Sequence, residues 1–184
     1  PHVHMHLPTA AGYSSDDFLS GSKAALMGGT TSLIDFVTPK KGQNLVEALQ
    51  LRKEEAANAL IPVAFHVSPI EWRDSLAEEI RHCVTLGVRS FKVYMAYKDS
   101  IGIDLEVLEK IMEVVAASGA LLTIHAEMGD EIEALRSHYF KSEPNGPLAH
   151  GLSRPPQTES LAVARAIELG IKTSCPLYFV HVSC

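Results

Sequence analysis

The sequence of 184 residues lacks several features that mark common classes of protein. Its three cysteines, Cys83, Cys175 and Cys184, are too few and too scattered for a disulfide framework or a Cys-x-x-Cys zinc site, and they suit a reducing compartment. No apolar run approaches the ~20 residues of a membrane span. No basic stretch leads into an apolar segment, as it would in a secretory signal. We therefore expect a cytoplasmic protein that does not bind a membrane.

Charge and composition point to one globular domain. The formal net charge is −6, and the 21% of charged residues show no basic excess, which argues against a nucleic-acid partner. The 46% of hydrophobic residues suffices for one sizeable core, and no repeat, low-complexity tract or linker divides the chain. Because the chain starts at Pro1 inside a strand-like segment and stops inside another, we interpret residues 1–184 as a single partial domain, truncated at both ends.

Short apolar runs rich in β-branched residues alternate with longer segments of helical periodicity. The pattern predicts strands at residues 3–4, 31–37, 62–67, 90–95, 121–125 and 177–182. It predicts helices at residues 15–27, 45–59, 72–86, 104–119, 130–139 and 158–169. Several of these helices are followed by a glycine, Gly170 among them, and we expect them to end there because glycine adopts positive φ without steric cost.

This alternation leaves two α/β architectures open, a doubly wound open sheet and a (β/α)8 TIM barrel. A nucleotide-binding open sheet needs a glycine-rich loop after a strand, whereas Gly28-Gly29 stands at a helix end before a strand. Candidate ligands instead recur at the carboxyl ends of different strands, where barrel enzymes place their chemistry. We therefore predict a TIM barrel of which about six of the eight βα units are present.

Four histidines lie on predicted strands or at their ends. His2 and His4 are two residues apart, so both side chains point to the same side of a strand, and His125 and His181 each end an apolar run. A single histidine on an apolar strand is more often a hydrogen-bonded core residue than a metal ligand. Four of them on three strands would each need a separate buried partner, so as a group they favour a metal site.

Lys92 stands inside the apolar run Ser90-Phe91-Lys92-Val93-Tyr94. A buried ammonium is costly unless it is paired or neutralised, and three accounts are open. The lysine forms an ion pair with a core carboxylate, or it is the Schiff-base lysine of an aldolase, or it reacts with CO2 to give a carbamate that bridges two metal ions. The four histidines favour the carbamate, because a Schiff-base site needs no metal, and two divalent ions about 3.5–4 Å apart can share a hydroxide and polarise a carbonyl.

Longer motifs span the whole chain. They are Pro1-His2-Val3-His4, Ser15-Asp16-Asp17-Phe18, Ala24-Ala25-Leu26, Gly28-Gly29-Thr30-Thr31, Ser90-Phe91-Lys92-Val93-Tyr94-Met95-Ala96-Tyr97-Lys98, His125-Ala126-Glu127, Leu152-Ser153-Arg154-Pro155 and Cys175-Pro176-Leu177-Tyr178 with Val180-His181-Val182. In these segments and in their order, the chain resembles the dihydropyrimidinase and hydantoinase branch of the cyclic amidohydrolases.

This resemblance implies a TIM barrel that opens the ring of a small cyclic amide, such as a dihydropyrimidine or a hydantoin, to give an N-carbamoyl amino acid. It also implies two divalent metal ions, most typically zinc. His2 and His4 would bind the more buried ion and His125 and His181 the second. A carbamate formed from Lys92 and CO2 would bridge the two.

The resemblance assigns further groups besides the metal ligands. Tyr97 would donate a hydrogen bond to the developing oxyanion, which is worth several kcal/mol in such sites. An aspartate on the last barrel strand would transfer the proton, and this chain ends before that strand. The full-length protein would form a homotetramer. Met128 and residues 7–13 depart from the family pattern and would affect specificity. His6 is not predicted as a ligand, and His66 is predicted as a core histidine or as one that supports a ligand.

Three other functions stay open at this point. A non-catalytic relative, like the collapsin-response mediator proteins, would have lost metal ligands, whereas all five predicted ligands are present here. Allantoinase and dihydroorotase are close enzymatic variants, and dihydroorotase usually differs around the loop after the first strand, where this chain has no obvious arginine for a carboxylate. A Schiff-base aldolase would use Lys92 and leave the histidines unexplained.

Overall fold

The computed structural model describes residues 1–9, 12–142 and 147–184. Its strands are β1 (Pro8–Thr9), β2 (Gly12–Tyr13), β3 (Leu33–Val37), β4 (Val63–Val67), β5 (Ser90–Tyr94), β6 (Leu121–His125) and β7 (Leu177–Phe179). Its helices are α1 (Phe18–Met27), α2 (Leu45–Glu55), the short 3₁₀ helix η1 (Ala56–Asn58), α3 (Leu76–Thr85), α4 (Leu105–Ala117), α5 (Gly129–Ser142), α6 (Pro147–Leu152) and α7 (Pro156–Thr173). Strands β3 to β7 form one sheet, and β1 and β2 form a separate antiparallel hairpin.

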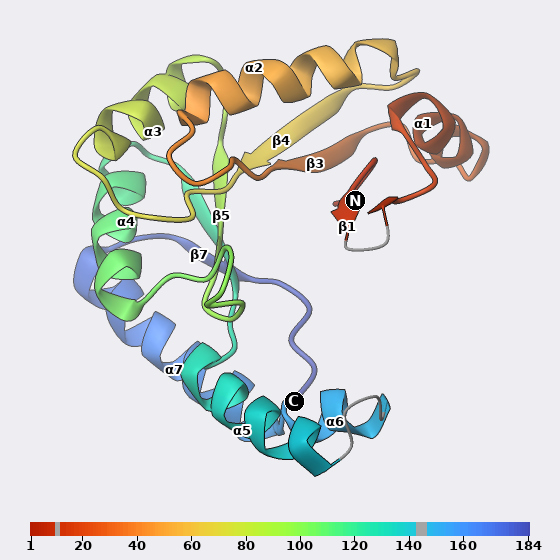
Figure 1. Cartoon of the computed structure of the whole chain (residues 1–184). Coiled ribbons are helices and arrows are strands. Elements are labelled where there is room, and N and C mark those ends of the chain that lie inside the picture. The colour runs from red at the N-terminus through yellow and green to blue at the C-terminus, as the bar shows by residue number, and fades with distance from the viewer. Residues whose placement is uncertain (10–11, 143–146) are drawn as a thin grey trace.

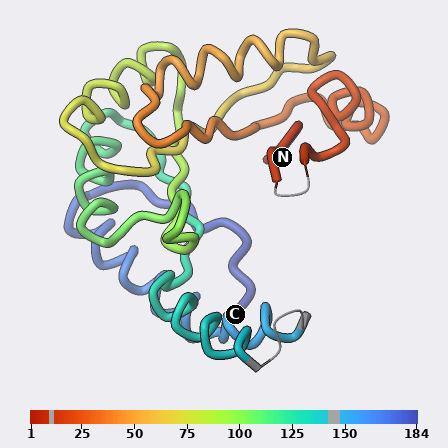
Figure 2. Tube along the Cα trace, viewed as in Figure 1, coloured from red at the N-terminus to blue at the C-terminus, as the bar shows by residue number. Residues whose placement is uncertain are grey.

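The larger sheet is parallel throughout and keeps the order of the sequence, β3-β4-β5-β6-β7. The start of the chain adds a parallel bridge between His2 and Ile34, next to β3. Helices α2, α3, α4 and α7 follow one another along one face of the curved sheet, each packed on the next, and both ends of the chain lie on the other side (Figures 1 and 2). The chain is therefore α/β with a parallel sheet, as the alternation of apolar runs predicts.

The core lies between the sheet and these helices. Helix α4 buries one stripe, since its four buried residues recur at helical spacing: Leu108, Ile111, Met112 and Val115. From the sheet, Phe91 and Val93 of β5 join the same apolar cluster. Because side chains alternate along a strand, Lys92 between them points to the opposite face, away from the helices. Burial of each large apolar side chain contributes about 1.5–3 kcal/mol, so this cluster fixes the direction in which Lys92 points.

The predicted end of the last helix at Gly170 is wrong. Helix α7 continues through Gly170 to Thr173 and ends at Ser174, whose φ of 56° is left-handed. A Cβ added at Gly170 would lie 2.6 Å from Cδ1 of Leu177, so this glycine allows α7 to pack closely on β7 and is no helix stop. Among the helices of the described residues, α7 included, none is long and apolar enough to cross a bilayer.

Two short elements were not predicted, and one predicted strand is reduced. The β1–β2 hairpin and α6 are absent from the predictions because neither is long enough to show a period. The strand expected at residues 3–4 forms no ladder and is present only as the single bridge at His2. The other five predicted strands are all found, with their ends shifted by no more than a few residues.

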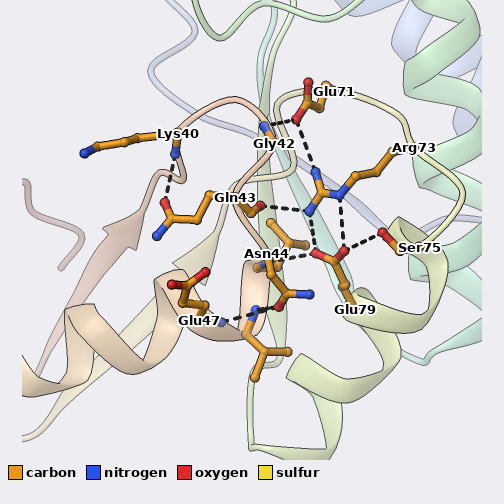
Figure 3. A network of polar contacts seen from close by, with 11 residues as sticks. Lys40, Gly42, Gln43, Asn44, Glu47, Glu71, Arg73, Ser75 and Glu79 are labelled. Atoms are coloured by element: carbon orange, nitrogen blue, oxygen red, sulfur yellow. Dashed lines mark hydrogen bonds and ion pairs between the residues drawn. The ribbon is translucent and has the colours of Figure 1, made fainter.

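A polar network joins the loop after β3 to the loop after β4 (Figure 3). The Arg73 guanidinium lies 2.5 Å from Oε2 of Glu79 and donates to the carbonyl oxygen of Gln43 at 2.8 Å. The Glu79 carboxylate also accepts the backbone N–H of Leu45 at 2.8 Å and the hydroxyl of Ser75 at 2.7 Å. Glu79 is nearly buried, so these contacts replace the water that its charge would otherwise need.

We expect Glu79→Gln to destabilise the fold at neutral pH by about 1–3 kcal/mol, because it removes the charge that Arg73 faces. Burial alone would raise the pKa of the Glu79 carboxyl, but the hydrogen bonds from Leu45, Arg73 and Ser75 outweigh it and hold the pKa below its usual 4.5. The ionised Glu79 carboxylate therefore stabilises the fold fully above about pH 4.5. This stabilisation is lost as the pH falls from there through the lowered pKa of Glu79. Urea unfolding at several pH values should show the deficit of the variant shrinking in acid, while the exposed Glu78→Gln shows none. A deficit independent of pH contradicts the assignment.

Candidate functional site

The predicted ligands come together from separate strands because the sheet is parallel. Lys92 lies in β5, His125 is the last residue of β6, and His181 follows two residues after β7. Parallel strands end at the same edge of a sheet, so these side chains approach one another although they are far apart in the sequence. His2 joins them from the β3 side through its bridge to Ile34.

A first group of rings is built around Phe36, next to the amino-terminal end of the chain. His4 stacks on Phe36 with ring centroids 4.2 Å apart, and His2 meets the same ring edge-on at 4.9 Å. His66 lies on a third side, 5.1 Å from Phe36. His2 and His4 are 5.7 Å apart, centroid to centroid. Phe36 thus fixes both predicted ligands of the first metal ion, and sequence reasoning did not single it out.

His66 lies in the core, which is one of the two roles predicted for it. It is buried, and its Nδ1 lies 2.5 Å from Oγ of Ser90. Burial, followed by the charges of His2 and Lys92, lowers its pKa to about 4, so the ring is neutral at physiological pH.

A second group joins β6 to the segment after β7. The rings of His125 and His181 lie 4.6 Å apart, and the ring of Tyr97 lies 5.1 Å from His125. Nε2 of His125 is 2.5 Å from Oε2 of Glu127, so one ring nitrogen already has a partner. The hydrogen bond from His125 lowers the pKa of the Glu127 carboxyl. The structure therefore brings together the two predicted ligands of the second ion and places Tyr97 beside them.

Lys92 lies between these two groups. It is only 2% exposed, and among the residues that the structure describes, no carboxylate forms an ion pair with it. Its Nζ lies 5.0 Å from the Tyr94 ring and 5.9 Å from the Phe36 ring. Burial lowers the pKa of the Lys92 amine to about 8. The first of the three accounts of Lys92, an ion pair with a core carboxylate, therefore has no partner in the described part of the chain.

The Lys92 charge affects histidines of both groups. The pKa values of His2, His4 and His181 are all lowered, with burial as the largest cause in each case and the Lys92 charge as a further one. A lowered histidine pKa favours the neutral imidazole, which is the form that binds metal ions. Lys92 thus acts on the His2–His4 pair and on His181 at once.

The imidazoles of the four histidines suit a metal centre, and they lie in two separate pairs, His2 with His4 and His125 with His181. Neutral imidazoles are ligands that such a centre uses. Within residues 1–9, 12–142 and 147–184, no set of three or more His, Cys, Asp or Glu side chains is gathered closely enough to hold an ion. Lysine is not among those residue types, and it is Lys92 that lies between the pairs. The five predicted ligands remain a prediction.

Tyr97 occupies a tight turn after β5. Its φ of 62° is left-handed, and its carbonyl oxygen accepts the N–H groups of Ser100, Ile101 and Gly102. A Cβ at Gly102 would lie 2.1 Å from the carbonyl oxygen of Ala96, so only glycine fits this turn. Burial and the neighbouring Glu127 raise the pKa of the Tyr97 hydroxyl, which keeps it protonated and able to donate a hydrogen bond.

The remaining residues that the sequence singled out lie apart from the two pairs. His6 stacks on Tyr13 beside the hairpin, with centroids 4.2 Å apart. Met128 lines an open pocket of about 390 Å³ together with Met95 and Lys98, at the ends of β5 and β6. Of residues 7–13, Pro8–Thr9 and Gly12–Tyr13 form β1 and β2, and positions 10 and 11 lie outside the described residues.

A buried ion pair that sequence reasoning missed holds the backbone next to His4. Asp35 of β3 is fully buried and pairs with Arg52 of α2, Oδ1 to Nη2, at 2.6 Å. Oδ2 of Asp35 accepts the N–H of Met5 at 2.8 Å, and Nη2 of Arg52 donates to the Met5 carbonyl oxygen at 2.5 Å. We call this arrangement of Asp35, Arg52 and the Met5 backbone the Met5 clamp. It fixes the chain directly after the first pair of histidines.

Comparison with known proteins adds sequence and structural relatives. No family model matches the chain. It is 38% identical over 186 residues to a D-hydantoinase of Geobacillus stearothermophilus, covering 100% of this chain and 40% of that protein. It is 38% identical over 183 residues to a dihydropyrimidinase of Rattus norvegicus, covering 98% of this chain and 35% of the relative. The chain thus spans well under half the length of these curated relatives.

Solved structures agree with this result. The dihydropyrimidinase of Brevibacillus agri NCHU1002 superposes on all of the chain with a TM-score of 0.96 at 38% identity, over 40% of that structure. The L-hydantoinase of Arthrobacter aurescens matches 90% of the chain with a TM-score of 0.79 at 25% identity, over 37% of its length.

Substitution of Asp35 tests the Met5 clamp. We expect Asp35→Asn to lower the free energy of unfolding by about 3–5 kcal/mol, because it removes the buried counter-charge of Arg52 and leaves only the half-exposed Glu55 carboxylate to pair with the guanidinium. The exposed pair Arg165–Glu168 provides the control, since Glu168→Gln should cost less than about 1 kcal/mol. Urea unfolding of both variants measures the difference, and equal small losses would show that the clamp does not stabilise the fold.

Proposed function

Since the chain belongs with the D-hydantoinase and dihydropyrimidinase family, of whose members it spans only part, we propose that the protein, at the full length of these relatives, hydrolyses a small cyclic amide. The bond broken is the C–N bond of a dihydropyrimidine or hydantoin ring, and the product is an N-carbamoyl amino acid. The observation that carries the proposal is Lys92, a buried amine without a carboxylate partner in the described residues, lying between two pairs of histidines.

The architecture that we propose for the whole domain is a TIM barrel. The strand-like start of the chain and β3 to β7 would supply about six of its eight βα units, and residues 1–184 would form one partial domain. A curved parallel sheet in sequence order, with its helices outside, is the arrangement that such a barrel needs (Figure 1).

Five side chains would hold two divalent metal ions, for which zinc is the first candidate and manganese, cobalt and nickel are others. We assign His2 and His4 to one ion and His125 and His181 to the second. Addition of CO2 to the neutral Lys92 amine, with loss of a proton, gives a carbamate that would bridge both. The lowered pKa of Lys92 supports this step, because it increases the neutral fraction of the amine. When bound, the ions would activate water and polarise the ring carbonyl.

The chain's own residues would complete the site around the substrate. Tyr97 donates a hydrogen bond to the carbonyl oxygen as negative charge develops on it. Its position beside His125 and its raised pKa support this role. Transfer of a proton to the departing ring nitrogen needs a further acid–base group, which the family resemblance assigns to an aspartate on a strand outside this chain.

The other functions have less support. The relatives reported above are named hydantoinase and dihydropyrimidinase, which favours these rings over those of allantoinase or dihydroorotase. A non-catalytic scaffold leaves the retained ligand set unexplained. A Schiff-base aldolase could use a lysine with a pKa of about 8, but it would not need the four imidazoles. We further propose a cytoplasmic homotetramer, for which the family resemblance is the support.

Substitution of Lys92 tests the metal centre. In the full-length protein we expect Lys92→Ala to lose bound metal and hydrolysis of dihydrouracil or hydantoin together, because the bridging group is gone. Short carboxylic acids should restore part of the activity by taking the place of the carbamate. The exposed Lys23→Ala serves as control. Unchanged metal content in Lys92→Ala, or trapping of a carbonyl substrate on Lys92 by borohydride, would contradict the proposal.

Substitution of Tyr97 tests the oxyanion role. We expect Tyr97→Phe to lower kcat by about 10²–10³-fold, since it removes one preorganised donor, and to leave metal content unchanged. Because the ring is partly exposed and is retained in phenylalanine, the unfolding temperature should change little. Steady-state kinetics with metal analysis measures both quantities. A rise in KM with unchanged kcat would assign Tyr97 to substrate binding alone.

A further inference from the structure

We propose that Glu127 is a positioning residue that fixes the orientation of the His125 ring. This inference rests on the proposed function and concerns a residue to which neither the sequence motifs nor the comparisons assign a role. It goes beyond the ligand set because it names the group that holds one of the predicted ligands in place.

The contact between the two side chains is short and shielded. Nε2 of His125 lies 2.5 Å from Oε2 of Glu127, and their side chains are 11% and 16% exposed. A carboxylate only accepts hydrogen bonds, so in this contact Nε2 carries the hydrogen and donates it.

Arg154 holds the carboxylate from the other side. Its Nε lies 3.9 Å from Oε1 of Glu127, while Nη1 lies 3.2 Å from Nδ1 of His150 and 3.4 Å from the His150 carbonyl oxygen. Arg154 comes from the junction of α6 and α7, whereas Glu127 closely follows β6. The carboxylate thus lies between His125 and the positive charge of Arg154, which favours its ionised form beside the ring.

In the described part of the chain, a carboxylate contacts a histidine of only one of the two pairs. Among the described residues, His125 is the sole member of the four predicted ligands with a carboxylate partner. The backbone beside His4 is held instead by the Met5 clamp, which does not involve Glu127. A carboxylate that orients a histidine typically contributes 10–100-fold to metal affinity. Loss of Glu127 should therefore weaken the second ion and leave the first in place.

The test uses the full-length protein loaded with zinc. Metal per chain is measured by elemental analysis after gel filtration, and the affinity of each ion is measured by competition with a chelator. We expect wild type to hold two ions, and Glu127→Ala to hold one firmly and the other about 10–100-fold more weakly. Glu127→Gln should keep both, because its side-chain oxygen still accepts the hydrogen of His125. Glu131→Ala, at an exposed position of α5, is the control.

The outcomes separate this inference from the proposed function. If His125→Ala loses one ion and Glu127→Ala keeps two at wild-type affinity, the function stands and the positioning role is wrong. If Glu127→Gln loses the ion as Glu127→Ala does, Glu127 is itself a ligand, and the role is again wrong. If wild type binds no metal, the proposed function fails. Should Glu127→Ala not fold, Glu127→Asp keeps the charge but shortens the reach, and it should show the same selective loss.

Discussion

Parallel pairing of the strands is the constraint on which the site depends. The register sets Lys92 opposite Thr123 and Tyr94 opposite His125, and it carries β7 alongside β6 up to Phe179. Each strand alternates its side chains, so one face of β5 joins the apolar core under the helices and the other presents Lys92. Residues that lie far apart in the sequence meet because their strands end at one edge, and no long loop is needed to bring them there.

Lys92 gives this edge its chemical character. A buried ammonium without a counter-charge is among the costliest groups that a fold can bury, and in the described part of the chain Lys92 has aromatic rings near its amine and no carboxylate paired with it. The fold tolerates it because burial shifts the amine towards its neutral form. Because burial of the Lys92 amine opposes folding, its presence is explained more readily by reactivity than by stability.

Much of the fold could be predicted from the sequence, since periodicity and β-branched runs are local signals. The parallel sheet follows from them, and Lys92 and the four histidines stood out by their positions in apolar strand runs, while the family resemblance assigned them to two ions. The end of α7 could not be predicted, because Gly170 is required by a contact with Leu177 and not by its own backbone conformation. Phe36, the Asp35–Arg52 pair and the Glu127 contact were also missed. The first two depend on side chains that are distant in the sequence, and the third, between His125 and Glu127, depends on how two side chains turn after β6; none of these leaves a periodic pattern.

The Met5 clamp has a consequence for how this segment can vary. Asp35 and Arg52 hold only the N–H and the carbonyl oxygen of residue 5, which every amino acid except proline offers. The side chain of Met5 is thereby left to pack elsewhere, and it fills the space beside Gly21 of α1, where a Cβ would lie 2.3 Å from its sulfur. The backbone atoms of Met5 thus set the direction of the chain at His4, while its side chain packs against α1. A smaller side chain at position 5 together with a larger one at position 21 is therefore compatible with the same direction of the chain at His4.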